Sequence, residues 1–301
     1  MTTRRWWLVG GAAALALLIA GAWFWVASSR SATPEDAALE YLHALESGDP
    51  ERVAATGAAV PETALGAFAG ATALIEDAEV TRPADTEGAE SASVDVAFVL
   101  DGEEHSARLT LVSGDGEWAV DESGLGTLTA RSAIGSDVAI GAASAAVGEE
   151  FAVLPAAYAV TAAPAELLAG ESAVRVLPGE EVTATVDARL RPEATTAAQD
   201  QLDAHLATCT EPADAAPAGC GIRIPWGTEF REVSEVRYRI ERAPTVALAP
   251  PTFAADGGAL VATVTGTGQD GAPRTTTYRT DSWSVRGDVA FSAEGLELSV
   301  W

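Results

Sequence analysis

Residues 93–100 read SVDVAFVL. Apolar side chains alternate there with polar or small ones, which is typical of a strand that buries one face. The dipeptide Asp101-Gly102 follows as a signal for a tight turn, and residues 105–112 supply the returning strand. A second turn, rich in glycine, leads into residues 117–120, so we expect an antiparallel meander in this part of the chain.

Helical patterns precede this meander. Thr33 can cap a helix whose first position is Pro34, and acidic residues in the first turn complement the helix dipole. Shorter helices are expected to begin near Pro50 and Pro61. Helices followed by a meander predict an α+β domain over residues 31–130, with the helices on one face of an antiparallel sheet.

Two segments of this domain resemble a known family. They are the helix PEDAALEYLHALESGD (residues 34–49) and the closing strand GDGEWAV (residues 114–120). Both are similar to segments of the cone-shaped α+β family typified by nuclear transport factor 2 and ketosteroid isomerase, whose membrane-anchored bacterial members lie outside the membrane without known enzymatic activity. The resemblance implies a pocket between the sheet and the helices. Its candidate lining residues are Tyr41, Leu65, Phe68, Phe98 and Trp118.

The residues of this domain favour binding over catalysis. Isomerase chemistry requires a carboxylate base and a buried hydroxyl or protonated acid that holds the enolate. Tyr41 is the one tyrosine of the domain and is expected in the core, while His43 and His105 are expected at the surface. The carboxylates lie mostly in turns and on polar faces, where nothing raises their pKa toward neutrality. We therefore expect no enzyme activity, no catalytic residue and no cofactor.

The N-terminal residues predict a membrane anchor. Arg4 and Arg5 precede a mainly apolar run over residues 6–27, and about 20 apolar residues in a helix cross the hydrocarbon core of a bilayer. Indole rings lie near both ends of the run, where such rings settle at the lipid–water boundaries. They belong to Trp6, Trp7, Trp23 and Trp25. The arginines predict a cytoplasmic N-terminus, a single transmembrane helix within residues 1–30 and an extracytoplasmic bulk.

A cleaved export signal is the alternative for the same residues. Ala27-Ser28-Ser29 offers the small side chains of a cleavage site, and the first ten residues also resemble a twin-arginine signal. Bulky side chains just before that site, and the length of the apolar run, favour the anchor.

The composition excludes several functions. The net charge is −26, and such an acidic surface repels nucleic acid, which we do not expect as a partner. The chain contains no Lys and no Asn, so lysine Schiff-base chemistry, a phosphate-loop lysine and Asn-linked glycans are excluded. A composition rich in Ala, Gly and Arg is typical of a high-GC genome such as that of an actinobacterium.

A second, strand-rich α+β domain is expected over residues 131–301, with a subdivision near residue 228. A helix is expected over residues 192–207, and Gly257-Gly258 indicates a turn between two later strands. The segment FAVLPAAYAV resembles part of a repeat of Gram-positive envelope proteins. That repeat has glycine where this chain has Ala156, so no functional residue is carried over from it.

Two cysteines outside the predicted membrane segment are expected to form a disulfide. Cys209 and Cys220 are an even pair in an exported chain, separated by a loop rich in Pro and Gly. Closing such a loop stabilises a protein by about 3 kcal/mol on the chain-entropy model. The alternative is a metal site that also uses His205, but no fourth ligand lies at a recognisable spacing, so we expect no metal.

One strand near residue 237 is locally basic. Its arginines are Arg231, Arg237, Arg239 and Arg242. Period two places Glu235, Arg237, Arg239 and Glu241 on one face, and Val236, Tyr238 and Ile240 on the other. We expect an exposed strand with ion pairs. The alternatives are an anion-binding ledge and a surface on which the acidic first domain docks.

Together these patterns predict a membrane-anchored, extracytoplasmic envelope protein that acts without catalysis in binding or scaffolding. Its expected partners are the lipid bilayer, through residues 6–27, and another envelope protein or a small apolar ligand. The alternative function is small-molecule or lipid binding in the cone pocket of residues 31–130, with isomerase-like catalysis as its remote extension. An open apolar pocket with converging polar groups would favour the alternative.

Overall fold

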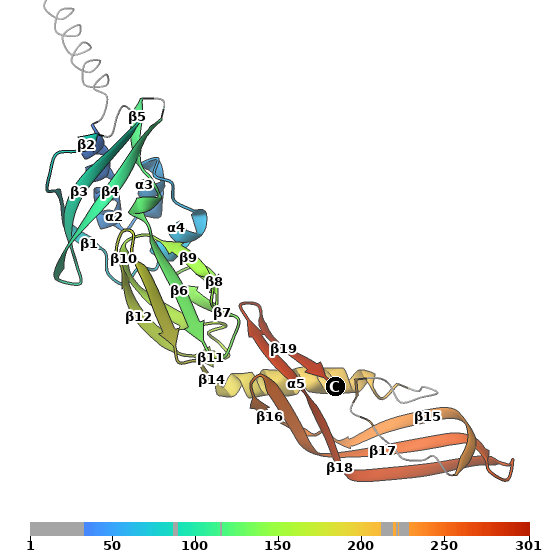
Figure 1. Ribbon diagram of the computed structural model, residues 1–301. Helices are drawn as coiled ribbons and strands as arrows, with labels where there is room; N and C mark the ends of the chain where they lie inside the picture. The colour runs from blue at the N-terminus through green and yellow to red at the C-terminus, as the bar shows by residue number, and fades with distance from the viewer. Residues whose placement is uncertain (1–32, 87–89, 115, 212–218, 221, 223–228) are drawn as a thin grey trace, which may run out of the picture. The chain divides into compact units, whose positions relative to one another are not determined.

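The computed structural model describes residues 33–301 except residues 87–89, 115, 212–218, 221 and 223–228 (Figure 1). Strands make up 55% of the described residues and helices 19%, so the fold is mostly β. The predicted α+β class, with a cone-shaped first domain, is therefore wrong. That prediction was based on helices before a meander in residues 31–130 and on one helix among the strands of residues 131–301, whereas long hairpins dominate the described chain.

In the part of the chain that the structure describes, no helix is both long and apolar enough to cross a membrane. The predicted transmembrane segment, residues 6–27, lies outside the described residues, as do Arg4 and Arg5. The membrane address of the protein therefore stays a prediction.

The chain divides into two compact units. The first contains the described residues up to Val60 together with Leu74–Leu125, and the second contains Pro61–Ala73 and Gly126–Trp301. The segment Pro61–Ala73 thus belongs with residues far along the chain, which no local pattern indicates.

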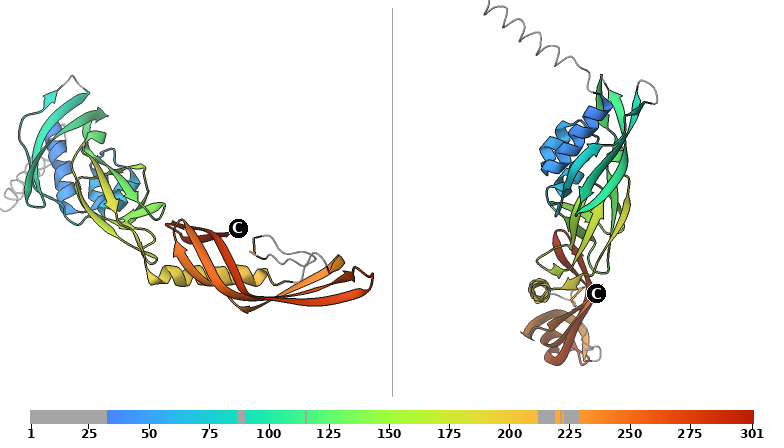
Figure 2. Two further views of the ribbon diagram at one scale, coloured as in Figure 1. Left: turned by 60° about the horizontal axis from the view of Figure 1, so that its bottom comes forward. Right: turned by 90° about the vertical axis from the view of Figure 1, so that its left-hand side faces the viewer.

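The first unit is a curved antiparallel sheet with helices on one face (Figure 2). Its helices are α2 (Pro34–Ser47), α3 (Pro50–Ala55) and the 3-10 turn η1 (Glu122–Gly124). Its strands are β1 (Ile75–Val80), β2 (Asp85–Thr86), β3 (Ser91–Leu100), β4 (Glu103–Gly114) and β5 (Glu117–Val120). The strand order is β1-β3-β4-β5, with β2 beside β3, and α2 packs against β1 and β5.

The predicted hairpin at the centre of this sheet is confirmed. β3 buries every second side chain, and Val94 pairs with Leu109 on the inner face. Asp101 and Gly102 form a two-residue loop in which both φ angles are positive, 55° and 76°. Positive φ at both loop residues matches the right-handed twist of the flanking strands.

The ends of α2 also follow the sequence prediction. Thr33 accepts a hydrogen bond from the Asp36 amide, and the Asp36 carboxylate accepts one from the Thr33 amide, both at 3.2 Å. Gly48 ends the helix with a φ of 67°. A Cβ atom at Gly48 would lie 2.7 Å from Leu74 Cδ1, so glycine is required there for space as well as for conformation.

Two carboxylates of α2 accept backbone hydrogen bonds from the edge of the sheet. Glu46 Oε1 accepts from the Ala78 amide of β1 at 2.9 Å, and Glu35 Oε1 accepts from the Ala84 amide at 2.7 Å. The bond from Ala84 holds the pKa of Glu35 below its usual range. A lowered pKa in the folded state adds stability above the ordinary pKa, and this stability is lost as the pH falls through the folded value.

The second unit begins with α4 (Glu62–Phe68) and three small sheets. The strands β12, β10, β7 and β8 form one sheet in that order, β13, β6 and β9 form another, and β11 pairs with β14. Their bounds are β6 (Gly126–Ser132), β7 (Asp137–Ile140), β8 (Ala143–Ala146), β9 (Glu150–Val153), β10 (Ala156–Ala162), β11 (Leu168–Ala169), β12 (Glu171–Val176), β13 (Glu181–Val186) and β14 (Arg189–Leu190).

The last part of the second unit is a half-barrel sheet with one helix (Figures 1 and 2). Its elements are α5 (Pro192–Thr208), β15 (Phe230–Arg242), β16 (Thr245–Ala249), β17 (Thr252–Gly268), β18 (Pro273–Ser292) and β19 (Gly295–Val300). The strand order is β15-β17-β18-β19, and β16 pairs with the start of β17. Ala198, Leu202 and Leu206 of α5 share one core with the buried side chains of these strands.

The turn predicted at Gly257-Gly258 is instead an irregularity inside β17. Gly257 has a φ of 79°, and the register with β18 shifts on both sides of Gly258. A Cβ atom at Gly258 would lie 2.9 Å from the Trp283 ring. The two glycines therefore bend one long strand around an indole ring.

Candidate functional site

The five residues of the predicted cone pocket are divided between the two compact units. Tyr41, Phe98 and Trp118 belong to the first unit, whereas Leu65 and Phe68 lie on α4 in the second. Within the first unit, the buried Tyr41 hydroxyl donates a hydrogen bond to the Gly124 carbonyl at 2.8 Å. Tyr41 is thus a core residue whose hydroxyl holds η1 in place.

His105 lies elsewhere than predicted. It pairs with Phe98 across the β3–β4 hairpin, with 6.0 Å between the ring centroids, and is half-buried on the inner face. Its Nε2 atom is buried and has no hydrogen-bond partner among the described residues. His105 shares its strand parity with the buried Leu109 and Leu111, and this alternation is the sequence signal that was missed.

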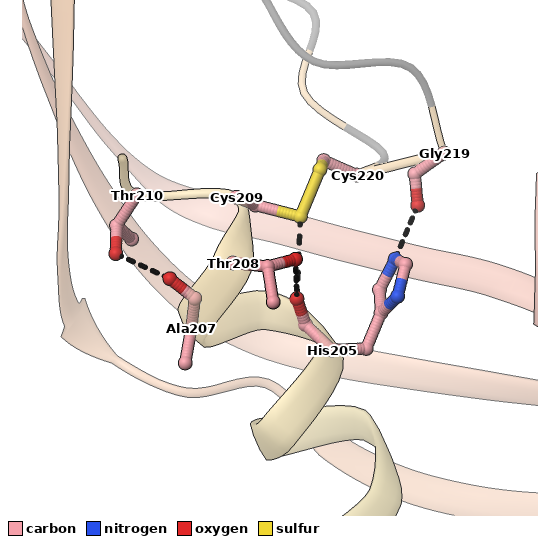
Figure 3. Close-up of a disulfide and its surroundings, with 7 residues drawn as sticks. All are labelled: His205, Ala207, Thr208, Cys209, Thr210, Gly219 and Cys220. Atoms are coloured by element: carbon pink, nitrogen blue, oxygen red, sulfur yellow. Dashed lines mark hydrogen bonds between the residues drawn. A yellow bond between two sulfur atoms is a disulfide. The ribbon is translucent and has the colours of Figure 1, made fainter. Parts of the chain in front are cut away.

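The disulfide between Cys209 and Cys220 is confirmed, and it fixes the end of α5 (Figure 3). His205 Nε2 lies 2.8 Å from the Gly219 carbonyl oxygen, so the imidazole ties the same two segments together. His205 and the two sulfur atoms lie close to one another, as a metal site would require. Both sulfur atoms are bonded to each other in the disulfide, however, and a metal ion binds cysteine as a thiolate. The disulfide form therefore offers no cysteine ligand.

A groove opens beside this disulfide, between α5 and the edge strand β15. Its volume is about 380 Å³. The helix side is lined by Asp203, Leu206, Ala207 and Thr210, and the strand side by Tyr238, Arg239, Ile240 and Ala243. Ala207 and Thr210 flank Cys209, so the disulfide holds one wall of the groove (Figure 3).

Tyr238, on the strand side of this groove, has a buried hydroxyl. The Tyr238 residue exposes only 5% of its surface, and its hydroxyl has no hydrogen-bond partner within the described part of the chain. Burial raises the pKa of Tyr238, so the phenol is neutral and can both donate and accept. A buried polar group without a partner destabilises a fold by about 1–3 kcal/mol.

The charged face of β15 lies opposite to the Tyr238 side chain, as the alternation predicts. Arg237 pairs with Glu235 at 2.9 Å, and Arg239 and Arg279 both pair with Glu241, at 2.9 and 2.8 Å. The hydrogen bond from Arg279 is the main cause that lowers the pKa of Glu241. These pairs favour the exposed ion-paired strand over an anion-binding ledge. Docking of the first domain on this face stays a prediction.

Two glutamines of α5 close the edges of the half-barrel, and sequence reasoning missed both. Gln199 Nε2 donates to the Pro244 carbonyl at 3.1 Å, and its Oε1 accepts from the Val246 amide at 2.9 Å. Gln201 pairs in the same way with two backbone groups of β19. It donates to the Leu296 carbonyl at 3.3 Å and accepts from the Leu298 amide at 2.7 Å.

Each glutamine amide therefore imitates the peptide group of a missing neighbouring strand. Residues two positions apart point to nearly opposite sides of a helix, so one helix can serve two edges. A Gln-x-Gln spacing in an otherwise amphipathic helix is the sequence signal for this arrangement, although it is weak by itself. Within the described ranges, the edge of β15 that faces away from β17 has no backbone partner.

Comparisons with known proteins give no further guide to this site, since no family model, no curated protein and no solved structure matches the chain.

Proposed function

We propose that this protein acts outside the cytoplasmic membrane as a non-catalytic binding or scaffolding protein of the cell envelope. The observation that carries the proposal is the Cys209–Cys220 disulfide, which involves the only two cysteines of the chain. Disulfides persist in oxidising compartments and are rare in the cytoplasm. The apolar run at residues 6–27, after Arg4 and Arg5, supports the same address and a hold on the lipid bilayer.

The groove between α5 and β15 supports a binding role. It combines apolar side chains, a neutral buried hydroxyl and a strand edge that has no partner among the described residues. The neighbouring arginines and carboxylates are occupied in ion pairs with one another. Such an arrangement recognises a ligand by shape and hydrogen bonding, and it needs no transfer of protons or electrons.

Reporter fusions test the address. A reporter that is active only in the cytoplasm, fused after Trp301, should be silent, and a reporter that is active only outside should be active at the same position. The reason is the arginine bias before residue 6. An active cytoplasmic fusion would show that the body of the protein is cytoplasmic.

A further inference from the structure

We propose that the groove between α5 and β15 binds an extended peptide segment of a partner protein, which adds to the free edge of β15 as a further strand. An inward side chain of this segment would hydrogen-bond the Tyr238 hydroxyl. This inference rests on the proposed binding role and specifies its site and its kind of ligand.

The first argument is the contrast between the edges of the half-barrel. At the start of β16, Gln199 pairs with the Pro244 carbonyl and the Val246 amide. In β19, Gln201 pairs with the Leu296 carbonyl and the Leu298 amide. β15 spans Phe230–Arg242 and pairs on one side only, with β17, as far as the described residues extend. A strand edge presents a row of amides and carbonyls, and the segment that matches such a row is an extended backbone.

The second argument is the Tyr238 hydroxyl. The Tyr238 residue lines the groove, and its hydroxyl is buried and is bonded to no described residue. The other two fully buried tyrosines, Tyr41 and Tyr158, donate to backbone carbonyls. A buried polar group is normally hydrogen-bonded, so this hydroxyl gains a partner only when the groove rearranges around a ligand.

The third argument is the fit between the groove and a peptide. A volume of about 380 Å³ admits side chains of a short segment rather than a folded domain. Leu206, Ala207 and Ile240 make the wall apolar, and Asp203 and Arg239 add one charge of each sign to the lining. With a net charge of −26 on the whole chain, the segment should be neutral or basic.

The test uses a displayed library of short random peptides, selected on the purified full chain with its disulfide intact. Ala207→Trp fills the groove, and Ala204→Trp is the matched control at an exposed position of α5 outside the groove. Enriched peptides should be neutral or basic and should alternate apolar and polar residues. Their affinity should fall about tenfold or more in Ala207→Trp and stay unchanged in Ala204→Trp. Tyr238→Phe should weaken binding severalfold without lowering stability.

Three results would overturn the proposal. One is the absence of any peptide that binds the parent chain better than Ala207→Trp, provided that both proteins unfold at similar temperatures. Another is unchanged binding of peptides whose backbone amides are methylated, because such peptides cannot pair with β15. The third is enrichment of acidic peptides. The fusion reporters test on which side of the membrane the protein lies, and none of these three results would change their outcome.

Discussion

At the scale of single residues, the hydroxyls of the buried tyrosines differ in whether they form a hydrogen bond within the described part of the protein. Tyr41 donates to Gly124 at 2.8 Å and Tyr158 donates to Leu154 at 2.6 Å, both between buried groups. A Cβ atom at Gly124 would lie 2.6 Å from Val120 Cγ1 and 3.1 Å from the Tyr41 hydroxyl, so glycine is needed there for space. Tyr238 makes no such bond with any described residue.

This difference predicts opposite effects of one substitution. Tyr41→Phe removes the partner of the Gly124 carbonyl and should lower the free energy of unfolding by about 1–3 kcal/mol. Tyr238→Phe removes an unpaired hydroxyl, so the free energy of unfolding should stay the same or rise. Hydrogen exchange in urea, read separately for peptides of each unit, measures both values. An equal loss in the two variants would mean that Tyr238 is bonded in solution.

At the scale of elements, helices of this protein complete its sheets with side chains. Glu35 and Glu46 of α2 accept amides near β1, and Gln199 and Gln201 of α5 pair with amides and carbonyls of β16 and β19. A carboxylate satisfies donors only, whereas a glutamine amide satisfies a donor and an acceptor together. Edge strands closed in this way are protected from pairing with other chains.

Replacing one glutamine tests this role. Gln199→Ala leaves the Val246 amide and the Pro244 carbonyl without partners, and we expect a loss of about 1–3 kcal/mol together with faster exchange of the Val246 amide. Asp200→Ala, on the exposed side of the same helix, should change neither quantity. The role would be refuted if Val246 exchanged at the same rate in Gln199→Ala and the parent chain.

The same elements show how far sequence patterns reach. The cap at Thr33, the turn at Asp101-Gly102 and the alternating faces of β15 depend on residues close together in the chain, and all three are confirmed. Two predictions that were wrong, the cone-shaped α+β class and the turn at Gly257-Gly258, depend on contacts between residues far apart in the chain. Trp283 decides the conformation of that glycine pair from about 25 positions away, and no local pattern contains this information.

At the scale of the whole molecule, the two units differ in what stabilises them. Both cysteines lie in the second unit, and the disulfide joins the end of α5 to the chain that leads into β15. The first unit contains no cysteine and relies on its sheet and on α2. Conditions that break the disulfide therefore act on one unit only.

Reduction should separate the two units in stability. A reductant, or the double substitution of Cys209 and Cys220 by Ser, should lower the free energy of unfolding of the second unit by about 2–4 kcal/mol. The first unit should unfold at the same urea concentration with or without the bond. Hydrogen exchange in urea distinguishes the units, and the double Ser variant treated with the same reductant is the control, because it has no disulfide to break. A shift in both units, or in neither, would contradict this expectation.

The crossing of α5 from one edge of the half-barrel to the other has a mechanical consequence. Gln199 is bonded to one edge and Gln201 to the other. A force that separates the two edges therefore acts on all four hydrogen bonds of α5 at once. Bonds loaded side by side resist together, whereas a free strand edge peels open one bond at a time. A pulling force on β16 or β19 is thus resisted by the side-chain bonds of α5. Among the described residues, no such bond resists a force on the outer edge of β15.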